Sequence, residues 1–181
     1  MADDRGLFIV AYGMGGHAAG EVASEMAARL LAEAFRPARG MSDDELMAQM
    51  VAAIRSANAA SFERTLQEHD KRGMGTTVTA LSLLPRRYLI GQVGASRAYL
   101  LRGGTFTQVT KDHSYVQEQV DAGRLSPDEA RVHPYANVIT RCVGSNGDVV
   151  PDLFVGTLEA GDLLLLASAG LTGMMEDDAL Q

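Results

Sequence analysis

The feature that most constrains the fold is a change in the spacing of apolar residues near residue 73. Before it, apolar residues recur at helical spacing over residues 21–35, and Ser-Asp-Asp-Glu at 42–45 has the pattern of a capping box that opens a second helix to about residue 69. After it, runs rich in Val, Thr, Leu and Ile predict strands over residues 76–84, 88–93, 97–101, 106–109, 137–143, 150–155 and 162–168. Residues 7–11 predict one more strand, and residues 113–122 and 126 onward predict a small helical insert. This order favours an α+β fold with antiparallel sheets over alternating parallel units.

The composition is that of one ordinary globular domain spanning residues 1–181. Apolar residues make up 46% and charged residues 22%, which suits a single core. The formal net charge of -7 makes nucleic acid an unfavourable partner, because an acidic chain repels phosphate backbones. The apolar run at 7–11 is too short for a signal peptide or a membrane span. We therefore expect a cytoplasmic protein that neither enters a membrane nor binds nucleic acid.

Several segments carry motifs whose order and spacing are informative together. They are LFIVAYGMGGHAAGE at 7–21, GMGTT at 73–77, VGASRAYL at 93–100 with TKDHS at 110–114, HPYANVITR at 133–141, and GDLLLLASAGLT at 161–172. Each is modest alone, but together they cover nearly the whole chain. In this order they resemble the PPM-type (phosphatase 2C-like) family of protein serine/threonine phosphatases.

The resemblance implies both a fold and a mobile element. The implied fold is α+β, with two packed antiparallel β-sheets flanked by helices. A helical flap is implied beside the site at residues 115–133, and Tyr115, Val116 and His133 are its expected substrate-facing residues.

The resemblance also implies a metal-dependent reaction that this chain departs from. Enzymes of this family use two divalent metals, usually Mn²⁺ or Mg²⁺, to activate a water and offset charge on the phosphoryl group. Hard cations of this kind need carboxylate oxygens, which the family supplies from aspartates in three of the motifs. At those positions this chain has Tyr12, Ala95 and Ala169.

Two further residues match the family site without restoring it. The family uses the backbone carbonyl of the position matched by Gly13 as a metal ligand, but one neutral carbonyl cannot hold a dication against water. His17 matches a family histidine near the site, a possible general acid; without metals we interpret it as a relic on a loop. His113 and His69 are expected to be structural or exposed, and no spacing indicates a replacement zinc site. We therefore expect no cofactor in this chain and assign no catalytic residue from the sequence.

The resemblance further implies a strand at each end of the domain that this sequence does not contain. Without them, sheet edges and part of an aliphatic core would be exposed, and exposed apolar edges invite pairing with another chain. The sequence therefore predicts self-association, a strand supplied by a partner, or marginal stability.

Three interpretations of the function remain open on the sequence. The first is a pseudophosphatase, an interaction module that binds a phosphoprotein, a kinase or a signalling regulator without hydrolysis. The second is an altered or trimmed form of a metal-dependent phosphoserine/phosphothreonine protein phosphatase. The third is a decaying fragment with no selected role. The first is the principal hypothesis, because the motifs around the three replaced positions are intact.

Overall fold

The computed structural model describes residues 6–180, apart from the side chains of residues 17 and 18. The strands are β1 (Leu7–Val10), β2 (Gly13–Met14), β3 (Gly75–Thr76), β4 (Val78–Leu84), β5 (Arg87–Val93), β6 (Arg97–Arg102), β7 (Thr105–Gln108), β8 (Asp152–Thr157) and β9 (Leu163–Ala167). The helices are α1 (His17–Ala34), α2 (Asp43–Gln67), the 3₁₀ helix η1 (His69–Lys71), α3 (Tyr115–Asp121), α4 (Pro127–Val132), α5 (Ala169–Thr172) and α6 (Asp177–Leu180).

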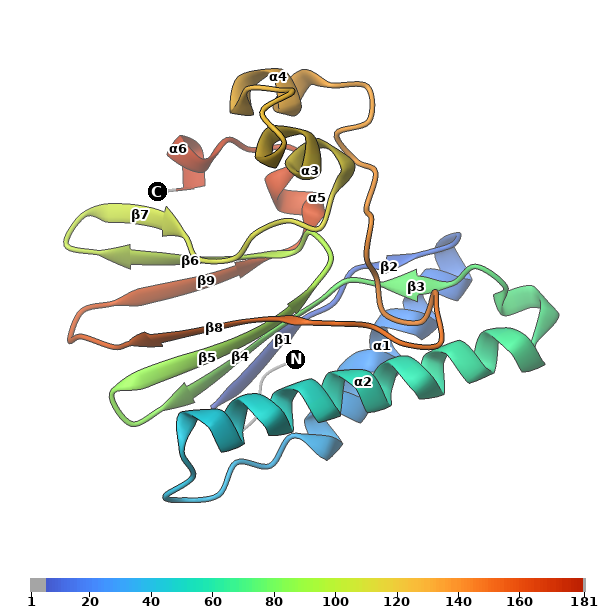
Figure 1. Cartoon of the computed structure of the whole chain (residues 1–181), viewed down its shortest axis with the longest axis horizontal. Coiled ribbons are helices and arrows are strands. Elements are labelled where there is room, and N and C mark those ends of the chain that lie inside the picture. The colour runs from blue at the N-terminus through green and yellow to red at the C-terminus, as the bar shows by residue number, and fades with distance from the viewer. Residues whose placement is uncertain (1–5, 181) are drawn as a thin grey trace.

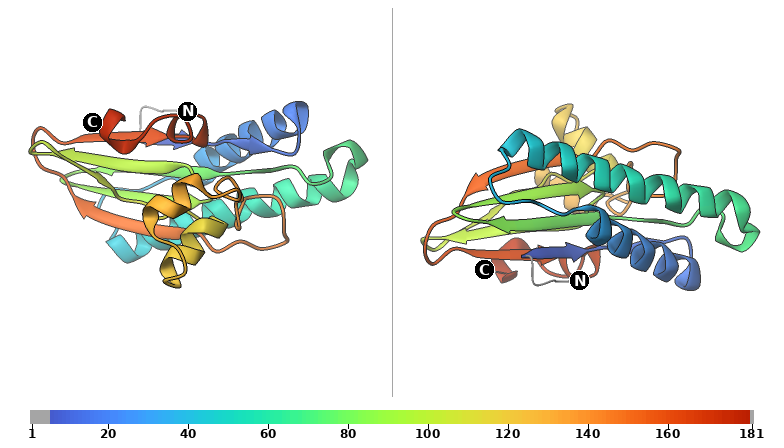
Figure 2. Two further views of the ribbon diagram at one scale, coloured as in Figure 1. Left: turned by 90° about the horizontal axis from the view of Figure 1, so that it is seen from above. Right: turned by 90° about the horizontal axis from the view of Figure 1, so that it is seen from below.

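The strands form two main antiparallel sheets that pack face to face. One sheet has the order β1-β4-β5-β8 and the other has the order β7-β6-β9, while β2 and β3 form a small separate pair. Helices α1 and α2 cover the outer face of the larger sheet, and α3 to α6 lie on the opposite side of the molecule, beyond the smaller sheet (Figures 1 and 2). The predicted α+β fold, with two packed antiparallel sheets flanked by helices, is confirmed.

The main core lies between the larger sheet and its two helices. Leu31 from α1, its C-terminal cap Phe35, and Met50 and Ile54 from α2 are fully buried against strands β4 and β5. The start of α2 is fixed by the predicted capping box: Glu45 N–H donates to the Ser42 hydroxyl, and Ser42 N–H donates to the Glu45 carboxylate. The long second helix therefore begins where the sequence predicts it.

A second apolar layer lies between the two sheets. Leu81 and Ile90 from the larger sheet and Ala98 from the smaller one are buried there. Leu164 and Leu166 of β9 pack against them but are only half-buried. This layer is therefore less closed than the layer under the helices.

The prediction of a strand over residues 137–143 is wrong. That segment makes only isolated bridges, Thr76 with Val143 and Ser114 with Ile139. Its backbone instead closes the helical insert, since Tyr115 N–H donates to Val138 O and Thr140 N–H donates to His113 O. The apolar run at 137–143 thus closes the base of the helical insert and does not extend a sheet.

The helical segments differ from the predictions mainly at their ends. Helix α1 begins four residues before the predicted start at residue 21, because the small residues at 18–20 carry no apolar stripe from which a helix can be recognised. Helices α3 and α4 occupy the predicted insert, and a second capping box opens α4 at Ser126 and Glu129. Within residues 6–180, none of the helices combines the length and apolar character needed to cross a membrane.

Candidate active site

The three replaced motif positions meet at one end of the two sheets. Val10 of β1 pairs with Thr79 of β4, and continuing that register places Tyr12 opposite Thr77. These two residues are joined, since Tyr12 N–H donates to Thr77 Oγ1 at 3.1 Å and Thr77 N–H donates to Tyr12 O at 3.0 Å. Strands β1 and β9 both run toward this end, from which β2 and α5 continue (Figure 1).

The register of the smaller sheet brings the other two positions to the same place. Arg97 of β6 pairs with Ala167 of β9, so Ala95 and Ala169, each two residues farther along, both lie just beyond the same end of this strand pair. The hydroxyl groups of Thr77 and Ser96 lie 2.6 Å apart and connect the two sheets at this end. The sequence could not show this meeting, because the segments are distant along the chain.

The glycine loop after Tyr12 is fixed by close backbone packing. A Cβ atom placed on Gly13 would lie 1.7 Å from the carbonyl oxygen of Gly20 in α1, so no side chain fits there. Tyr12 itself is 44% exposed, so its ring is not held inside the core. His17 begins α1, and its side chain lies outside the described residues, so its predicted role as a relic is untested.

A network of hydrogen bonds holds the turn that carries Ala95. Gly94 has a φ of +99°, a conformation that glycine adopts without strain. The side-chain amide of Gln92 donates to the carbonyl oxygens of Gly94 and Ser96, and the hydroxyl of Thr79 donates to Ser96 O at 2.7 Å. The frame of the turn is therefore rigidly positioned although residue 95 contributes only a methyl group.

His113 ties this turn to the helical insert. Gly94 N–H donates to His113 Nδ1 at 2.9 Å, and His113 N–H donates back to Gly94 O at 3.0 Å. Because Nδ1 accepts, Nε2 carries the proton and donates to Asp152 Oδ2 at 2.9 Å. Burial alone would raise the pKa of Asp152, but hydrogen bonds from His113 and Arg141 bring that pKa below its ordinary value. His113 is thus a buried structural residue, as one of the two predicted alternatives had it.

The predicted flap residues lie in the insert that follows His113. Tyr115 opens α3, Val116 follows it half-buried, and His133 is the C-terminal cap of α4. The rings of Tyr115 and His133 lie 5.8 Å apart, and the ring of Tyr135 contacts both. The sequence did not single out Tyr135, although an aromatic residue beside His133 was the available signal. That these residues face a substrate, and that the insert moves, stay predictions.

The described residues gathered at this end do not fit a two-metal centre. They offer the carbonyl of Gly13, the phenol of Tyr12 and the methyl groups of Ala95 and Ala169, where hard divalent cations require several carboxylate oxygens. Among the described residues, no group of three or more His, Cys, Asp or Glu side chains could hold a metal ion. The nearby carboxylate of Asp112 is engaged by the Arg97 guanidinium at 2.7 Å.

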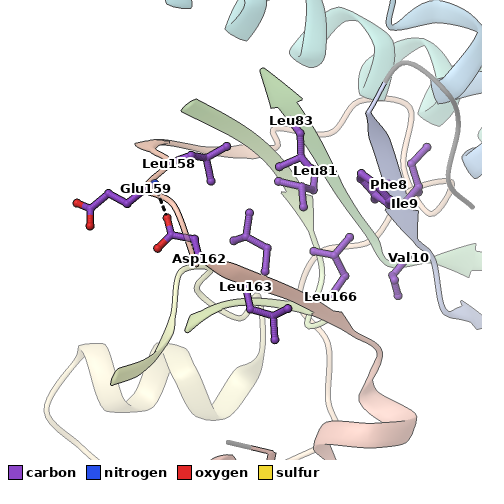
Figure 3. A pocket seen from close by; sticks show the side chains of 11 residues that line it. Phe8, Ile9, Val10, Leu81, Leu83, Leu158, Glu159, Asp162, Leu163 and Leu166 are labelled. Atoms are coloured by element: carbon purple, nitrogen blue, oxygen red, sulfur yellow. Dashed lines mark hydrogen bonds between the residues drawn. The ribbon is translucent and has the colours of Figure 1, made fainter. Parts of the chain in front are cut away.

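A cavity of about 590 Å³ lies elsewhere, between the two sheets at their β1 and β9 margins. It is lined mainly by apolar side chains, among them Phe8, Leu81, Leu83, Leu158 and Leu166 (Figure 3). Hydrogen bonds from Arg102 and from Glu159 N–H lower the pKa of Asp162 at its rim to about 2. None of Tyr12, Ala95 and Ala169 lines this cavity, so it is distinct from the end of the sheets where those positions lie, called here the motif-bearing end. The apolar lining suits hydrophobic groups and not a phosphate.

Comparison with known proteins identifies the family to which the chain belongs. The Protein phosphatase 2C family model matches residues 2–180. A serine/threonine phosphatase stp of Listeria welshimeri is 39% identical over 180 residues, which covers 99% of this chain and 71% of the relative. The serine/threonine protein phosphatase PstP of Mycobacterium tuberculosis is 42% identical over 178 residues, which covers 96% of this chain but only 33% of the relative.

Solved structures agree with the sequence comparisons. The crystal structure of the Mycobacterium tuberculosis phosphatase PstP/Ppp superposes with a TM-score of 0.88 at 41% identity, covering 96% of this chain and 72% of that one. The catalytic domain of PstP in complex with two manganese ions gives a TM-score of 0.81 at 40% identity, covering 95% of this chain and 70% of that one. The chain therefore belongs to the protein phosphatase 2C (PPM-type) family.

Proposed function

We propose that this chain is an altered form of a metal-dependent protein phosphatase that acts on phosphoserine and phosphothreonine side chains. The relatives that cover 96–99% of its length are named serine/threonine phosphatases, which supports the substrate class. Its partners are then phosphoproteins, with the kinases that phosphorylate them or a signalling regulator as further candidates. The expected cytoplasmic compartment stays a prediction.

The observation that carries the proposal is the convergence of Tyr12, Ala95 and Ala169 at one end of the sandwich. The backbone around these positions keeps its supports, namely the Gly13 approach to Gly20 and the hydroxyl pair of Thr77 and Ser96. A scaffold that holds three positions together in this way suits a site built from side chains at those positions.

The side chains at positions 12, 95 and 169 are what distinguish this chain from a metal-dependent phosphatase. When bound in such phosphatases, two divalent cations supply an activated water and neutralise charge on the phosphoryl group. Neither a phenol nor a methyl group replaces a carboxylate in that role, since hard divalent cations prefer carboxylate oxygens. The chain's own residues keep the shape of the site and the attachment of the insert.

A second candidate function is a pseudophosphatase that binds phosphoproteins without hydrolysing them. The replacement of all three motif acids by Tyr12, Ala95 and Ala169 favours this candidate. The two candidates share phosphoprotein recognition and differ in whether Asp residues at the three positions restore turnover.

Restoring the carboxylates tests the proposal. The variant Tyr12→Asp/Ala95→Asp/Ala169→Asp is compared with the starting chain, and with a control that carries Asn at the same positions. Binding of Mn²⁺ is measured by calorimetry and turnover with a phosphothreonine peptide. We expect no tight Mn²⁺ binding and no turnover above a buffer blank in the starting chain, partial gain of both with Asp, and no gain with Asn, which lacks the charge.

Each outcome separates the candidates. Micromolar binding of two Mn²⁺ ions and turnover by the starting chain would show that its site is not impaired. If the Asp variant folds but gains neither property, while the starting chain still prefers the phosphorylated peptide to the unphosphorylated one, the pseudophosphatase candidate is favoured. If neither protein distinguishes the two peptides and no turnover appears, the proposed function is wrong.

A further inference from the structure

Three aromatic rings meet on the helical insert, outside the motif-bearing end. Tyr115, His133 and Tyr135, called here the flap trio, have centroid separations of 5.8, 5.7 and 5.6 Å around the triangle. Their planes are inclined to one another by 44° to 85°. The trio joins the start of α3 to the residues after α4, so both ends of the insert contribute to it.

The flap trio lies at the surface and belongs to none of the buried apolar clusters. Tyr135 is 57% exposed, and the adjoining Val132 and Val138 are 85% and 45% exposed. The insert stands away from both sheets, next to α5 and α6 (Figure 1). Contiguous exposed apolar side chains of this kind mark interaction surfaces more often than isolated ones do.

The arrangement of the rings suits a cation. A positive group about 4 Å above the plane of the three centroids would lie about 5 Å from each of them, and over any ring face this distance is inside the roughly 6 Å range of cation–π attraction. His133 Nδ1 accepts a hydrogen bond from Tyr135 N–H at 3.0 Å, which is compatible with the uncharged imidazole. The trio therefore offers π-electron density without a charge that would repel a cation.

The charges around the trio favour a positive partner. Glu118 of α3 and Asp128 of α4 are exposed, and neither has an ion-pair partner among the described residues. Of the basic groups on the same insert, Arg131 is paired with Glu176, whereas Arg124 donates only to the uncharged amide oxygen of Gln119 and keeps its positive charge. The chain as a whole carries a formal charge of -7. The free carboxylates thus complement a basic segment and disfavour an acidic one.

We infer that the flap trio is a docking site for an arginine side chain of a phosphoprotein segment. The guanidinium group stacks on aromatic rings and is less strongly hydrated than the lysine ammonium group, so it loses less on leaving water. This inference rests on the proposed function, because it takes the partner to be a phosphoprotein. It adds a basic residue near the phosphorylated one as the feature that selects among such partners.

A simpler role for the three rings is to hold α3 against α4 without binding anything. The two roles differ in what an aromatic ring at position 135 does. If the trio only packs, removing the Tyr135 ring changes stability alone. If it docks a cation, removing the ring also abolishes discrimination between a charged and an uncharged arginine.

The test uses fluorescein-labelled nine-residue peptides that contain one threonine and one arginine. Each is made phosphorylated and unphosphorylated, and each again with citrulline, the uncharged isostere of arginine, or with lysine. Fluorescence anisotropy measures their binding to the full chain and to the variants Tyr135→Ala, Tyr135→Phe and Leu66→Ala. Leu66 is a matched control, since it is 66% exposed and lies on α2. Thermal unfolding of every variant checks that it folds.

We expect citrulline to weaken binding to the starting chain about two- to fivefold, the size of an exposed cation–π contact. Lysine should fall between arginine and citrulline. Tyr135→Ala should bind the arginine and citrulline peptides equally, whereas Tyr135→Phe and Leu66→Ala should keep the difference.

Equal binding of the arginine and citrulline peptides by the starting chain would overturn the inference, as would absence of binding at millimolar peptide. Retention of the full difference by a folded Tyr135→Ala variant would do so too. The phosphorylated and unphosphorylated arms keep this result separate from the proposed function. If arginine matters and phosphate does not, the docking site stands, while phosphoprotein recognition at the motif-bearing end fails.

Discussion

The two faces of the larger sheet are covered to different degrees. On the face under α1 and α2, Leu31, Phe35, Met50 and Ile54 are fully buried. On the face toward the smaller sheet, Leu164 and Leu166 of β9 are only half-buried beside a cavity of about 590 Å³ (Figure 3). The difference teaches that the helix layer holds this domain together, whereas the layer between the sheets stays open at one margin.

The open margin does not coincide with the motif-bearing end. The hydrogen-bonded frame of Thr77, Ser96 and Gln92 is fully buried, since each of these residues is 0% exposed. The supports of the site therefore depend on the well-packed part of the molecule, and changes at the open margin should affect stability and association before they affect the site.

The largest expected effect contrasts a deletion in each layer. Ile54→Ala should lower the free energy of unfolding by about 2–5 kcal/mol, because it leaves a cavity among fully buried neighbours. Leu164→Ala, on the open side, should cost only about 1 kcal/mol, because its side chain is half-exposed already. Urea denaturation of both variants measures the contrast. Equal losses would mean that the layer between the sheets is packed as tightly as the helix layer.

An intermediate effect concerns association through the open margin. Strand β9 is the outer strand of its sheet, its five residues are all apolar, and Leu163 is 61% exposed. Because an uncharged apolar edge can pair with a copy of itself, we predict self-association along β9 at micromolar concentration. Leu163→Glu should weaken it about tenfold, since an antiparallel pair would bring buried charge into the contact.

Sedimentation equilibrium over a dilution series measures this association. Leu66→Glu provides the control, as Leu66 is equally exposed but lies on the helix layer. A chain that stays monomeric at every concentration, with an ordinary melting temperature, would show that the edge is already covered.

The smallest expected effect is a pH dependence at the rim of the cavity. Asp162 accepts from Arg102 Nη2 at 2.6 Å, and hydrogen bonds lower its pKa from 3.8 to about 2. Since the folded pKa lies below the unfolded one, the carboxylate stabilises the fold above pH about 4 and loses that contribution as the pH falls toward about 2.

Asp162→Asn should therefore lower the melting temperature at neutral pH, and the gap to the starting chain should close as the pH falls. Thermal unfolding between pH about 7 and about 2 follows this gap. Asp148→Asn, which removes the partner of Arg55 in the helix layer, allows the same comparison on the other side of the sheet. A gap that stays constant down to the lowest pH would show that the Asp162 carboxylate contributes through packing and not through its charge.

Much of the fold follows from local patterns in the sequence. The capping box at Ser42 and most of the β-rich runs after residue 73 predicted the element that forms there. The run at 137–143 misled, because apolar content does not reveal whether backbone groups pair within a sheet or close an insert.

The sequence predicted which residues belong to the site but not the contacts that bring them together. Motifs indicated that positions 12, 95 and 169 belong together. The contacts that bring them together, between Thr77 and Ser96 and between Gly94 and His113, depend on strand register and tertiary packing. Tyr135 escaped notice for a similar reason, since its two aromatic neighbours are placed by the closure of the insert.

The contact between Gly13 and Gly20 has a consequence for how such chains diverge. Any side chain at Gly13 would collide with the backbone of α1, whereas Tyr12 beside it is partly exposed and accepts a bulky ring. A mutation at position 12 can therefore change the side chain without disturbing the fold, whereas a mutation at position 13 prevents α1 from packing against the loop. A glycine signature of this kind therefore records the shape of a loop and does not by itself report whether the chain is an active enzyme.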